Sequence, residues 1–477
     1  MSDASFMMRR LIPAFIAFPF ALQLFGCATT SYDRMPKWDP DAESALKQLA
    51  VWETEGNAVA TRSSQAIQIE HFEIPLRLLE KDFSKRVDPE TFNSIVFKRD
   101  GEEFVRWIIN PEDTKWHLEV AKWLESKGVS SRRHKHFRAY MTASRSYLIE
   151  DPTTGASFSA KVSTNVTGGN WKDKKLDLGD SREVRLMSEY IEDVADRVHF
   201  RRLRFLPEPM LMGIEDIDQA MLVRSLEPMK NGETLLLPLF SALHENVGRE
   251  IALRNGSHDP AAFWEKNLAI PLAEAYAELA AHFGFTYDSP HGQNFMIELD
   301  RNYRPTGRMY FKDFADAYLT RPHFQATGAT QVLDGFYQNN VTNELRVAIG
   351  LLHGNKPPSW IDVQRYHQMN VSFYKSFERV FSKITGIPAE ELTDVYYGGS
   401  NFSTSTDFGY YNKSYSTKSE SWKNFLAKAP CAQGKAPRHK CLQEMASKLR
   451  IHPDHLPDPM ACEAILQNIL VRNVPGT

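Results

Sequence analysis

Two stretches decide the fold of this chain: HGQNFMIEL at residues 291–299 and MYFKDF at residues 309–314. Apolar residues alternate along the first stretch, and a second apolar run follows a segment punctuated by Pro305 and Gly307. This pattern predicts an antiparallel hairpin. Its pairing would bring Asn294, at the start of the first strand, close to Asp313, just after the second.

The residue types at this end of the hairpin suit a phosphate group and its magnesium ion. His291, Gln293 and Asn294 supply an imidazole and two amides, and Asp313 supplies a carboxylate. Magnesium prefers hard oxygen ligands, which Asn294 and Asp313 would provide. The structural alternative is that a His or Asn satisfies a turn, which is the commoner role of such residues.

Residues upstream of the hairpin predict a small antiparallel sheet and a helix. The predicted strands are 144–150, 156–166, 210–214 and 220–223. Lys161 lies near the middle of the second of these, and the predicted helix 181–198 carries Glu183 and Glu189, which are available to pair with a lysine. Kinase-like folds have the same order of elements, with an asparagine and a later aspartate that hold the metal. We therefore expect an α+β fold with a small sheet lobe, a mainly helical lobe and a nucleotide-type cleft between them.

The remaining segments complete a provisional domain plan. Apolar spacing predicts buried helices at 264–283 and 360–384, and Asp100-Gly101 predicts a tight hairpin turn between short strands. Residues 398–417 lack periodicity and are expected to form an exposed loop. The expected units are a signal peptide at 1–27, a tether at 28–41, a cap at 42–130, the sheet lobe at 131–228, the helical lobe at 229–420 and a helical tail at 421–477.

The hairpin motif, preceded by FGFTYDSP at residues 283–290, resembles the carboxy-terminal region of siderophore synthetases of the aerobactin type, the IucA/IucC and FhuF-like group. ASRS at residues 143–146 is similar to that family's Ser-x-Arg-Thr element, and KVS at 161–163 is similar to its Lys-Leu-Ser strand. The resemblance spans roughly Met141 to Leu319, under half the chain. It implies a kinase-like palm and an ATP- and magnesium-dependent enzyme that joins citrate-like carboxylates to amines or alcohols through an acyl-adenylate.

The resemblance also implies roles for individual residues. Lys161, His291 and Asp313 would be catalytic, Asn294 and Asp313 would hold magnesium, and the nucleotide would contact Arg145, Lys161, Ser163, His291, Gln293 and Asn294. Three positions depart from the family pattern: Ala143, Gly169-Asn170, and Asp173 where an arginine is expected, although lysines surround it. The family's amino-terminal His-Pro signature is also missing, with His134-Lys135-His136 only a loose counterpart.

Gln293 favours adenylation over phosphate transfer. A kinase uses a carboxylate near this position to accept the proton of a hydroxyl, whereas a carboxylate substrate is already a nucleophile. Arg145 and Lys161 would offset the repulsion between two anions. The structural alternative is that these two basic residues are ordinary charges on a strand face.

The amino terminus resembles a bacterial lipoprotein signal. Arg9-Arg10 precede an apolar run at 11–25. This run is shorter than a membrane-spanning helix, which needs about 20 residues. LFGC at 24–27 resembles a lipobox, with Cys27 as the acylated residue. Ala28, with no Asp after the cysteine, is compatible with outer-membrane sorting. We therefore expect a membrane-anchored periplasmic lipoprotein. The structural alternative is a buried apolar helix with an incidental cysteine.

A periplasmic location conflicts with an ATP-dependent reaction, because ATP is thought to be absent there. Two alternatives therefore stay open: a non-catalytic lipoprotein that binds an anion or siderophore, and a kinase-like phosphotransferase. In each case the expected partners are the membrane and a small anionic, carboxylate- or siderophore-like ligand. The net charge of −3 over 477 residues gives no reason to expect nucleic acid.

The cysteines do not form a metal-binding pattern. Besides Cys27 the chain has Cys431, Cys441 and Cys462, whose spacing matches neither a zinc ribbon nor an iron-sulfur cluster. In an oxidising compartment Cys431 and Cys441 could close a short disulfide loop, and the sequence leaves that pairing open.

Overall fold

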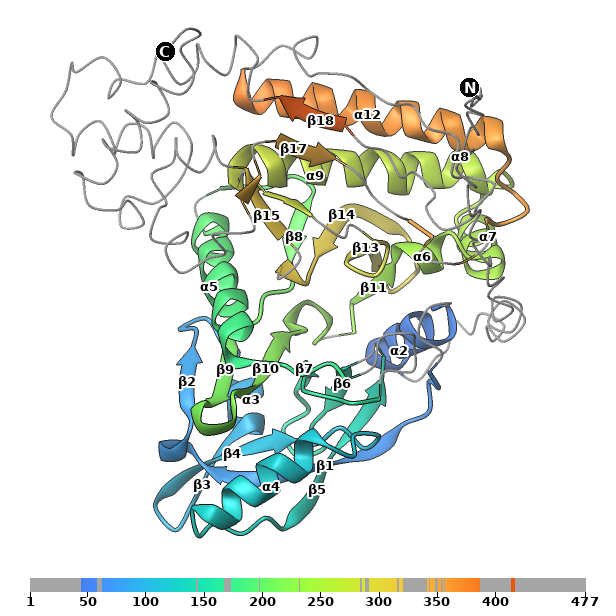
Figure 1. Ribbon diagram of the computed structural model, residues 1–477. Coiled ribbons are helices and arrows are strands. Elements are labelled where there is room, and N and C mark those ends of the chain that lie inside the picture. Colours follow the sequence, from blue (N-terminus) through green and yellow to red (C-terminus); the bar gives the residue numbers. More distant parts are fainter. Residues whose placement is uncertain are drawn as a thin grey trace, which may run out of the picture.

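The hairpin predicted around residue 300 is present in the computed structural model, where β13 (Phe295–Asp300) pairs antiparallel with β14 (Pro305–Phe311) (Figure 1). The register places Phe295 opposite Phe311. One step further, the backbone N–H of Lys312 donates to the carbonyl of Asn294 over 3.0 Å. The paired strand ends therefore bring Asn294 beside Lys312 and Asp313, as the sequence pattern predicted.

The hairpin is the middle of a four-stranded sheet in the helical lobe. Its order is β11-β13-β14-β8, with β11 (Thr234–Pro238) antiparallel to β13 and β8 (Leu203–Phe205) parallel to β14. The helices of this lobe are α6 (Leu239–Ala242), α7 (Glu245–Arg254), α8 (Pro260–Trp264), α9 (Ile270–Phe283) and α12 (Val363–Thr385). A π-helical turn over Glu265–Ala269 joins α8 to α9. The helices predicted at 264–283 and 360–384 are thus confirmed, and they lie side by side above the sheet (Figure 1).

The other lobe is built on a nine-stranded antiparallel sheet, larger than the small sheet that the sequence predicted. In spatial order its strands are β2 (Glu80–Phe83), β9 (Met210–Ile214), β10 (Gln219–Ser225), β7 (Ser157–Lys161), β6 (Ser146–Glu150), β5 (Arg133–Met141), β1 (Ile67–Pro75), β4 (Glu102–Ile108) and β3 (Val96–Arg99). The strands that precede residue 130 pair with those that follow it, since β1 lies between β4 and β5. The sheet therefore runs across the expected boundary between cap and sheet lobe.

Local sequence signals explain the ends of several elements in this lobe. Asp100 and Gly101 have φ of 52° and 85°, as the tight β3–β4 turn requires, so the predicted hairpin is confirmed. β7 ends at Lys161 instead of continuing to residue 166, because the chain then turns and Thr164 pairs with Lys174. The helices of this lobe are α3 (Pro89–Ile95), α4 (Trp116–Ser126) and α5 (Leu178–Ala195), the last close to the predicted 181–198.

The helix α2 (Ala45–Glu55) lies where the two lobes meet (Figure 1). Leu49 and Ala50 belong to a buried apolar cluster that also contains Leu148 of the nine-stranded sheet and Met296 and Tyr310 of the four-stranded sheet. Burial of apolar surface is the main source of stability in such a cluster. α2 thus packs against both sheets at once.

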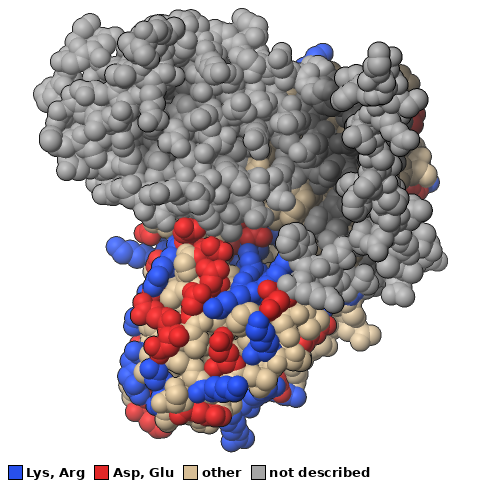
Figure 2. Space-filling model, viewed as in Figure 1, with Lys and Arg blue, Asp and Glu red and all other residues tan. Residues whose placement is uncertain are grey.

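The face of the sheet lobe shown in Figure 2 interleaves basic and acidic side chains. Pairs between different elements include Arg86 with Asp193 at 2.6 Å and Lys127 with Asp216 at 2.8 Å. Exposed pairs of this kind contribute little to stability individually. On the described part of this face, charges of both signs alternate over short distances.

The structure describes residues 44–57, 62–142, 145–166, 173–196, 198–230, 232–283, 285–287, 291–314, 317–320, 341–342, 344–347, 351–352, 355, 357–386 and 413–416. The predicted signal peptide with Cys27, the tether, and the tail with Cys431 and Cys441 lie outside these residues. Five further short strands are described: β12 (Phe285–Tyr287), β15 (Ala317–Thr320), β16 (Val341–Thr342), β17 (Glu344–Val347) and β18 (Lys413–Ser416). β18 falls inside the predicted loop 398–417, so that prediction is wrong for its last residues. Among the helices described here, none is both long and apolar enough to cross a bilayer.

Candidate functional site

A pocket of about 210 Å³ lies between the nine-stranded sheet and the end of the β13–β14 hairpin. Its polar lining comes from both lobes and from α2. The polar lining residues are Glu53, Thr142, Arg145, Ser146, Ser159, Lys161, Lys174, Arg224, His291, Gln293, Asn294, Lys312 and Asp313. Of the expected site residues that the structure describes, it thus brings together all except Ser163. Cys27 lies outside the described residues.

An ion pair across the pocket joins the two lobes. Lys161 is the last residue of β7, and its Nζ lies 3.0 Å from Oδ1 of Asp313. Arg224 on the neighbouring strand β10 approaches the same oxygen, at 3.7 Å from Nη2. A basic side chain of the sheet lobe therefore faces the carboxylate of the helical lobe, which is the arrangement that the sequence argument required.

Asp313 is held in its ionised form. Burial alone would raise the pKa of this carboxyl, but the charges of Lys161, Arg224 and Arg145 outweigh burial and keep the pKa well below its usual range. Its backbone has φ of 63°, a left-handed conformation that non-glycine residues adopt infrequently. Such conformations concentrate at functional sites, where the surrounding structure enforces them.

The pocket carries an excess of positive charge. Arg145, Lys161, Lys174, Arg224 and Lys312 line it, against the carboxylates of Glu53 and Asp313. A partly enclosed pocket strengthens the attraction of such a set for an anion, because water screens the charges less than at an open surface. The pocket is therefore suited to an anionic ligand.

Two of these basic side chains are buried in ion pairs behind the pocket. Nε of Arg224 donates to Glu208 over 2.8 Å, and Lys312 pairs with Glu53 of α2. Burial lowers the pKa of Lys312, with Glu53 opposing that effect. Burial also acts to lower the pKa of Arg224, but Glu208 and Asp313 outweigh burial and raise that pKa. The guanidinium is therefore permanently charged.

The HGQN segment contributes neutral polar groups. Burial lowers the pKa of His291, so its imidazole is neutral at physiological pH. The side chain of Asn294 is 2% exposed, and its Nδ2 has no hydrogen-bond partner among the described residues. A buried amide without a partner is costly, so Asn294 is suited to hydrogen-bonding a ligand in the pocket.

Two expectations from the sequence are corrected here. Ser163 does not line the pocket, because its buried Oγ accepts from the backbone N–H of Leu176 over 2.8 Å and so fixes the turn after β7. Lys161 pairs with Asp313 and not with a glutamate of α5. In that helix Glu189 lies 3.9 Å from Arg185, one turn away.

Sequence reasoning did not assign a role to Glu53, Lys174, Arg224 or Lys312. Arg224 follows the apolar run 220–223, and a charge inside a buried strand is a signal that could have identified it. Lys174 stands beside Asp173, at the place where the resemblance expects an arginine. Glu53 carried no local signal, since it is far from the other pocket residues in sequence.

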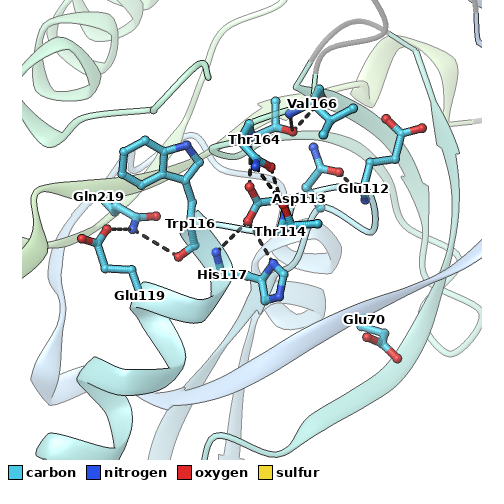
Figure 3. Close-up of polar contacts among 12 residues, drawn as sticks. Glu70, Glu112, Asp113, Thr114, Trp116, His117, Glu119, Thr164, Val166 and Gln219 are labelled. Atoms are coloured by element: carbon cyan, nitrogen blue, oxygen red, sulfur yellow. Dashed lines mark hydrogen bonds and ion pairs between the residues drawn. The ribbon is translucent and has the colours of Figure 1, made fainter. Parts of the chain in front are cut away.

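A polar cluster at the start of α4 fixes the segment that follows Lys161 (Figure 3). Asp113 Oδ1 accepts from the backbone N–H of Asn165 over 3.0 Å, and Oδ2 accepts from that of His117 over 2.7 Å. Thr164 also receives support, because its N–H donates to the carbonyl of Lys174 over 3.0 Å. The two pocket lysines are thus positioned by one network.

We expect Asp113→Ala to lower the free energy of unfolding by about 1 kcal/mol, because it leaves the half-buried N–H groups of His117 and Asn165 without their acceptor. Urea unfolding of the full chain measures this. Asp113→Asn keeps one acceptor oxygen and should lose less, and Glu125→Gln on the exposed face of α4 should change little. An Ala variant as stable as the parent would contradict the assigned role of Asp113.

Gly292 allows the HGQN segment to lie close to the backbone at Leu351 and at Phe240. A Cβ at this position would lie 2.2 Å from the carbonyl oxygen of Leu351 and 3.2 Å from the backbone nitrogen of Phe240. The carbonyl of Gly292 also accepts from the N–H of Leu239 over 3.1 Å. The segment therefore cannot move away without losing a hydrogen bond.

We expect Gly292→Ala to destabilise the protein by about 1–3 kcal/mol through this overlap. Thermal unfolding of the full chain would show a lower Tm. Gly179→Ala in α5 is a matched control, because the nearest atom to its new Cβ lies 3.5 Å away. An equal Tm for both variants would contradict the close approach.

The donor set agrees with magnesium bound together with phosphates. No group of three or more His, Cys, Asp or Glu side chains in the described ranges forms a self-sufficient metal site. Magnesium usually takes only one or two carboxylates from the protein and completes its shell with water and substrate phosphates. The ionised Asp313 and the amide of Asn294 fit that limited role.

No family model and no curated protein matches the sequence. Among solved structures, the aerobactin synthetase IucC of Klebsiella pneumoniae is similar, with 11% identity, a TM-score of 0.47, and coverage of 72% of this chain and 69% of IucC. The petrobactin biosynthesis protein AsbB of Bacillus anthracis has 14% identity, a TM-score of 0.46, and coverage of 67% and 60%. ATP-bound aerobactin synthetase IucA of K. pneumoniae has 11% identity, a TM-score of 0.45, and coverage of 67% and 65%. The matched part is less than two thirds of AsbB and IucA.

Proposed function

We propose that this chain is an ATP-dependent ligase that activates a small carboxylate as an acyl-adenylate. The observation that carries the proposal is the pocket in which Lys161 and Arg224 from the sheet lobe meet Asp313 from the hairpin. The excess of basic side chains around this contact suits a triphosphate and a second anion. The resemblance of the HGQN and KDF segments to siderophore synthetases supports the same reaction class.

In the proposed reaction a carboxylate oxygen of the substrate attacks the α-phosphorus of ATP. The bond from that phosphorus to the β-phosphate bridging oxygen breaks, and pyrophosphate leaves. An amine or alcohol then attacks the acyl carbon and displaces AMP, and the proton that the nucleophile loses passes to water. Arg145, Lys161 and Lys174 lower the repulsion between the anions and the charge that develops on the phosphate oxygens.

Asp313 and Asn294 would hold the magnesium ion. When bound, magnesium neutralises phosphate charge and orients the leaving pyrophosphate. Asp313 remains ionised at any physiological pH, since the surrounding cations depress its pKa. The amide of Asn294 would also find the hydrogen-bond or ligand contact that it lacks among the described residues.

Gln293 and the paired lining carboxylates favour this chemistry over transfer of phosphate to a hydroxyl. A kinase requires a base beside the acceptor hydroxyl. Gln293 lines the pocket but cannot accept a proton, and both lining carboxylates, Glu53 and Asp313, are paired with lysines. A carboxylate substrate needs no such base.

The rival proposal is a non-catalytic lipoprotein, anchored through Cys27, that holds an anionic ligand at the membrane. It is favoured by the pairing of the pocket's cations, since Lys161, Arg224 and Lys312 each contact a carboxylate of the chain itself. Pairing of this kind stabilises the buried cations when no ligand is bound. A periplasmic location would also deprive the site of ATP.

Calorimetry with the full chain, titrated with ATP in the presence and absence of magnesium, tests the proposal. We expect binding that requires magnesium and, with a panel of small carboxylates, exchange of labelled pyrophosphate into ATP. Lack of ATP binding would overturn the ligase. Magnesium-dependent binding without exchange for any carboxylate would favour the rival.

A further inference from the structure

A second pocket, of about 330 Å³, lies between the carboxy-terminal end of α5 and strand β8. We call it the α5–β8 pocket. Its apolar wall comes from α5 and from the segment that follows that helix, and includes Ile191, Ala195, Val198, Phe200, Leu203 and Phe205. A mainly apolar lining with a few charged groups is typical of a site for a small organic ligand.

The α5–β8 pocket is separate from the pocket at Asp313. Leu206 lines the pocket at Asp313, whereas its neighbours Phe205 and Pro207 line the α5–β8 pocket. No described residue lines both pockets. The segment 205–207 therefore forms a wall between them.

Two aromatic rings shape the α5–β8 pocket. Phe200 and Phe205 meet edge to face, with their ring centroids 5.8 Å apart. Phe200 belongs to the buried core of the helical lobe, and Phe205 is half-buried. Aromatic rings form favourable edge-to-face and offset contacts with further rings. The wall is therefore suited to the apolar, ring-sized body of a ligand.

The acids that line the α5–β8 pocket already have partners within the chain. Asp196 lies 2.6 Å from Arg86, which also lines the pocket. Glu192 accepts from Ser84 Oγ over 2.9 Å and lies 3.9 Å from Arg185. These contacts offset the negative charge of both acids, so the wall offers little attraction to a cationic ligand.

Arg204 differs from the other charged groups of this wall. Its Nη1 donates to the backbone carbonyls of Phe200 and Leu203 over 2.9 Å and 2.6 Å. Among the described residues, no carboxylate pairs with Arg204. The two hydrogen bonds hold the half-buried guanidinium in place and leave Nε and Nη2 for a ligand. A guanidinium edge of this kind binds a carboxylate through two parallel hydrogen bonds.

We propose that the α5–β8 pocket binds a small carboxylate with a ring-sized apolar body. The acid pairs with Arg204, and the body lies against Phe200 and Phe205. The charge complementarity selects an anion, because Arg204 is the lining group whose charge the described part of the chain leaves unpaired. The inference does not depend on the ligase reaction, since the site lies outside the proposed nucleotide pocket.

Titration of phenylacetate with the full chain, followed through the NMR signals of the ligand, tests the site. We expect a Kd of about 1 mM, because so few ligand atoms provide limited binding energy. Phenylacetamide and 2-phenylethylamine keep the ring but lack the acid, and each should bind at least about tenfold more weakly. Tighter binding of the amine than of phenylacetate would overturn the proposal.

Variants of the wall locate the bound acid. Arg204→Gln should weaken phenylacetate binding by at least about tenfold, because it removes the charged partner. Arg201→Gln is the matched control, since Arg201 is exposed and does not line the pocket. If Arg204→Gln does not fold, Ala195→Phe fills the pocket while it keeps Arg204, and it should abolish binding. Parental affinity in Arg204→Gln or in Ala195→Phe would overturn the proposal.

Lys161→Met distinguishes this site from the basic pocket at Asp313, which is also suited to an anion. We expect the affinity for phenylacetate to stay unchanged in Lys161→Met. Loss of binding there, with binding retained in Arg204→Gln, would place phenylacetate in the nucleotide pocket and overturn the α5–β8 site alone. No binding by the parent chain at about 10 mM phenylacetate would also overturn it. A parent chain that does not bind MgATP would overturn the ligase and leave this inference standing.

Discussion

Asp313→Asn is expected to lower the rate of pyrophosphate exchange by about 10²–10³-fold, the scale of a lost electrostatic contact in a catalytic site. The variant removes the only carboxylate that touches both Lys161 and Arg224 in the described part of the pocket. It leaves Lys161 without its acid, while Arg224 keeps Glu208, and it removes the anionic ligand of magnesium. We expect magnesium to stop improving ATP affinity as a result.

Asparagine keeps the shape of the side chain and tolerates the left-handed backbone at this position. Asp218→Asn is a matched control, because Asp218 also has positive φ, at 50°, and also pairs with a lysine, Lys175 at 3.1 Å, but lies outside the pocket lining. Equal exchange rates for the two variants would contradict the assigned role of Asp313 in the reaction. Pyrophosphate exchange and calorimetry with and without magnesium measure both effects.

Arg224→Met is expected to lower the free energy of unfolding by about 3–5 kcal/mol, the usual cost of breaking a buried ion pair from one side. Glu208 is buried and accepts hydrogen bonds from Arg224 and, over 3.0 Å, from Ser188 Oγ. Among the described residues, Arg224 is the only basic side chain that pairs with Glu208. Removal of the guanidinium leaves the Glu208 carboxylate buried without a charged partner. Urea unfolding of the full chain measures the loss.

A second variant distinguishes the effect of the unpaired Glu208 charge from the effect of lost side-chain packing. Arg224→Met combined with Glu208→Gln removes both charges, so it should recover a large part of the stability lost in the single variant. If the double variant is no more stable than Arg224→Met, the contact with Glu208 does not account for the effect. The same double variant should bind MgATP weakly, since the pocket still lacks the guanidinium of Arg224 and only Lys161 remains beside Asp313.

The two largest effects thus fall on residues that sequence reasoning treated differently. Asp313 was identified because a period-2 pattern and two turn residues fix which strand ends meet. Arg224 lies in β10, opposite Ser159 of β7, and only that pairing directs it toward Asp313. Strand order in a nine-stranded sheet depends on contacts between distant segments, which one sequence does not reveal.

The extent of the sheet shows the same limit. Hairpins such as β3–β4 and β13–β14 were predictable, because their turns and alternation are local signals. The insertion of β1 between β4 and β5 was not, and so a cap was expected where the chain builds four of the nine strands. Ser163 was misplaced for a related reason: strand β7 ends at Lys161, and the residues beyond it turn into a buried network.

The sequence alone determined the hairpin, the helices above it, the α+β class and the residues HGQN and KDF that meet at one strand end. Those features follow from periodicity, turn chemistry and side-chain type, each of which acts over a few neighbouring residues. Only the tertiary structure decided that Arg224 and Lys174 join Lys161 in the pocket and that Glu53, from a helix 259 positions before Lys312, completes its wall. The physical reason is that buried charges must find partners wherever packing brings them together, and packing is a property of the whole chain.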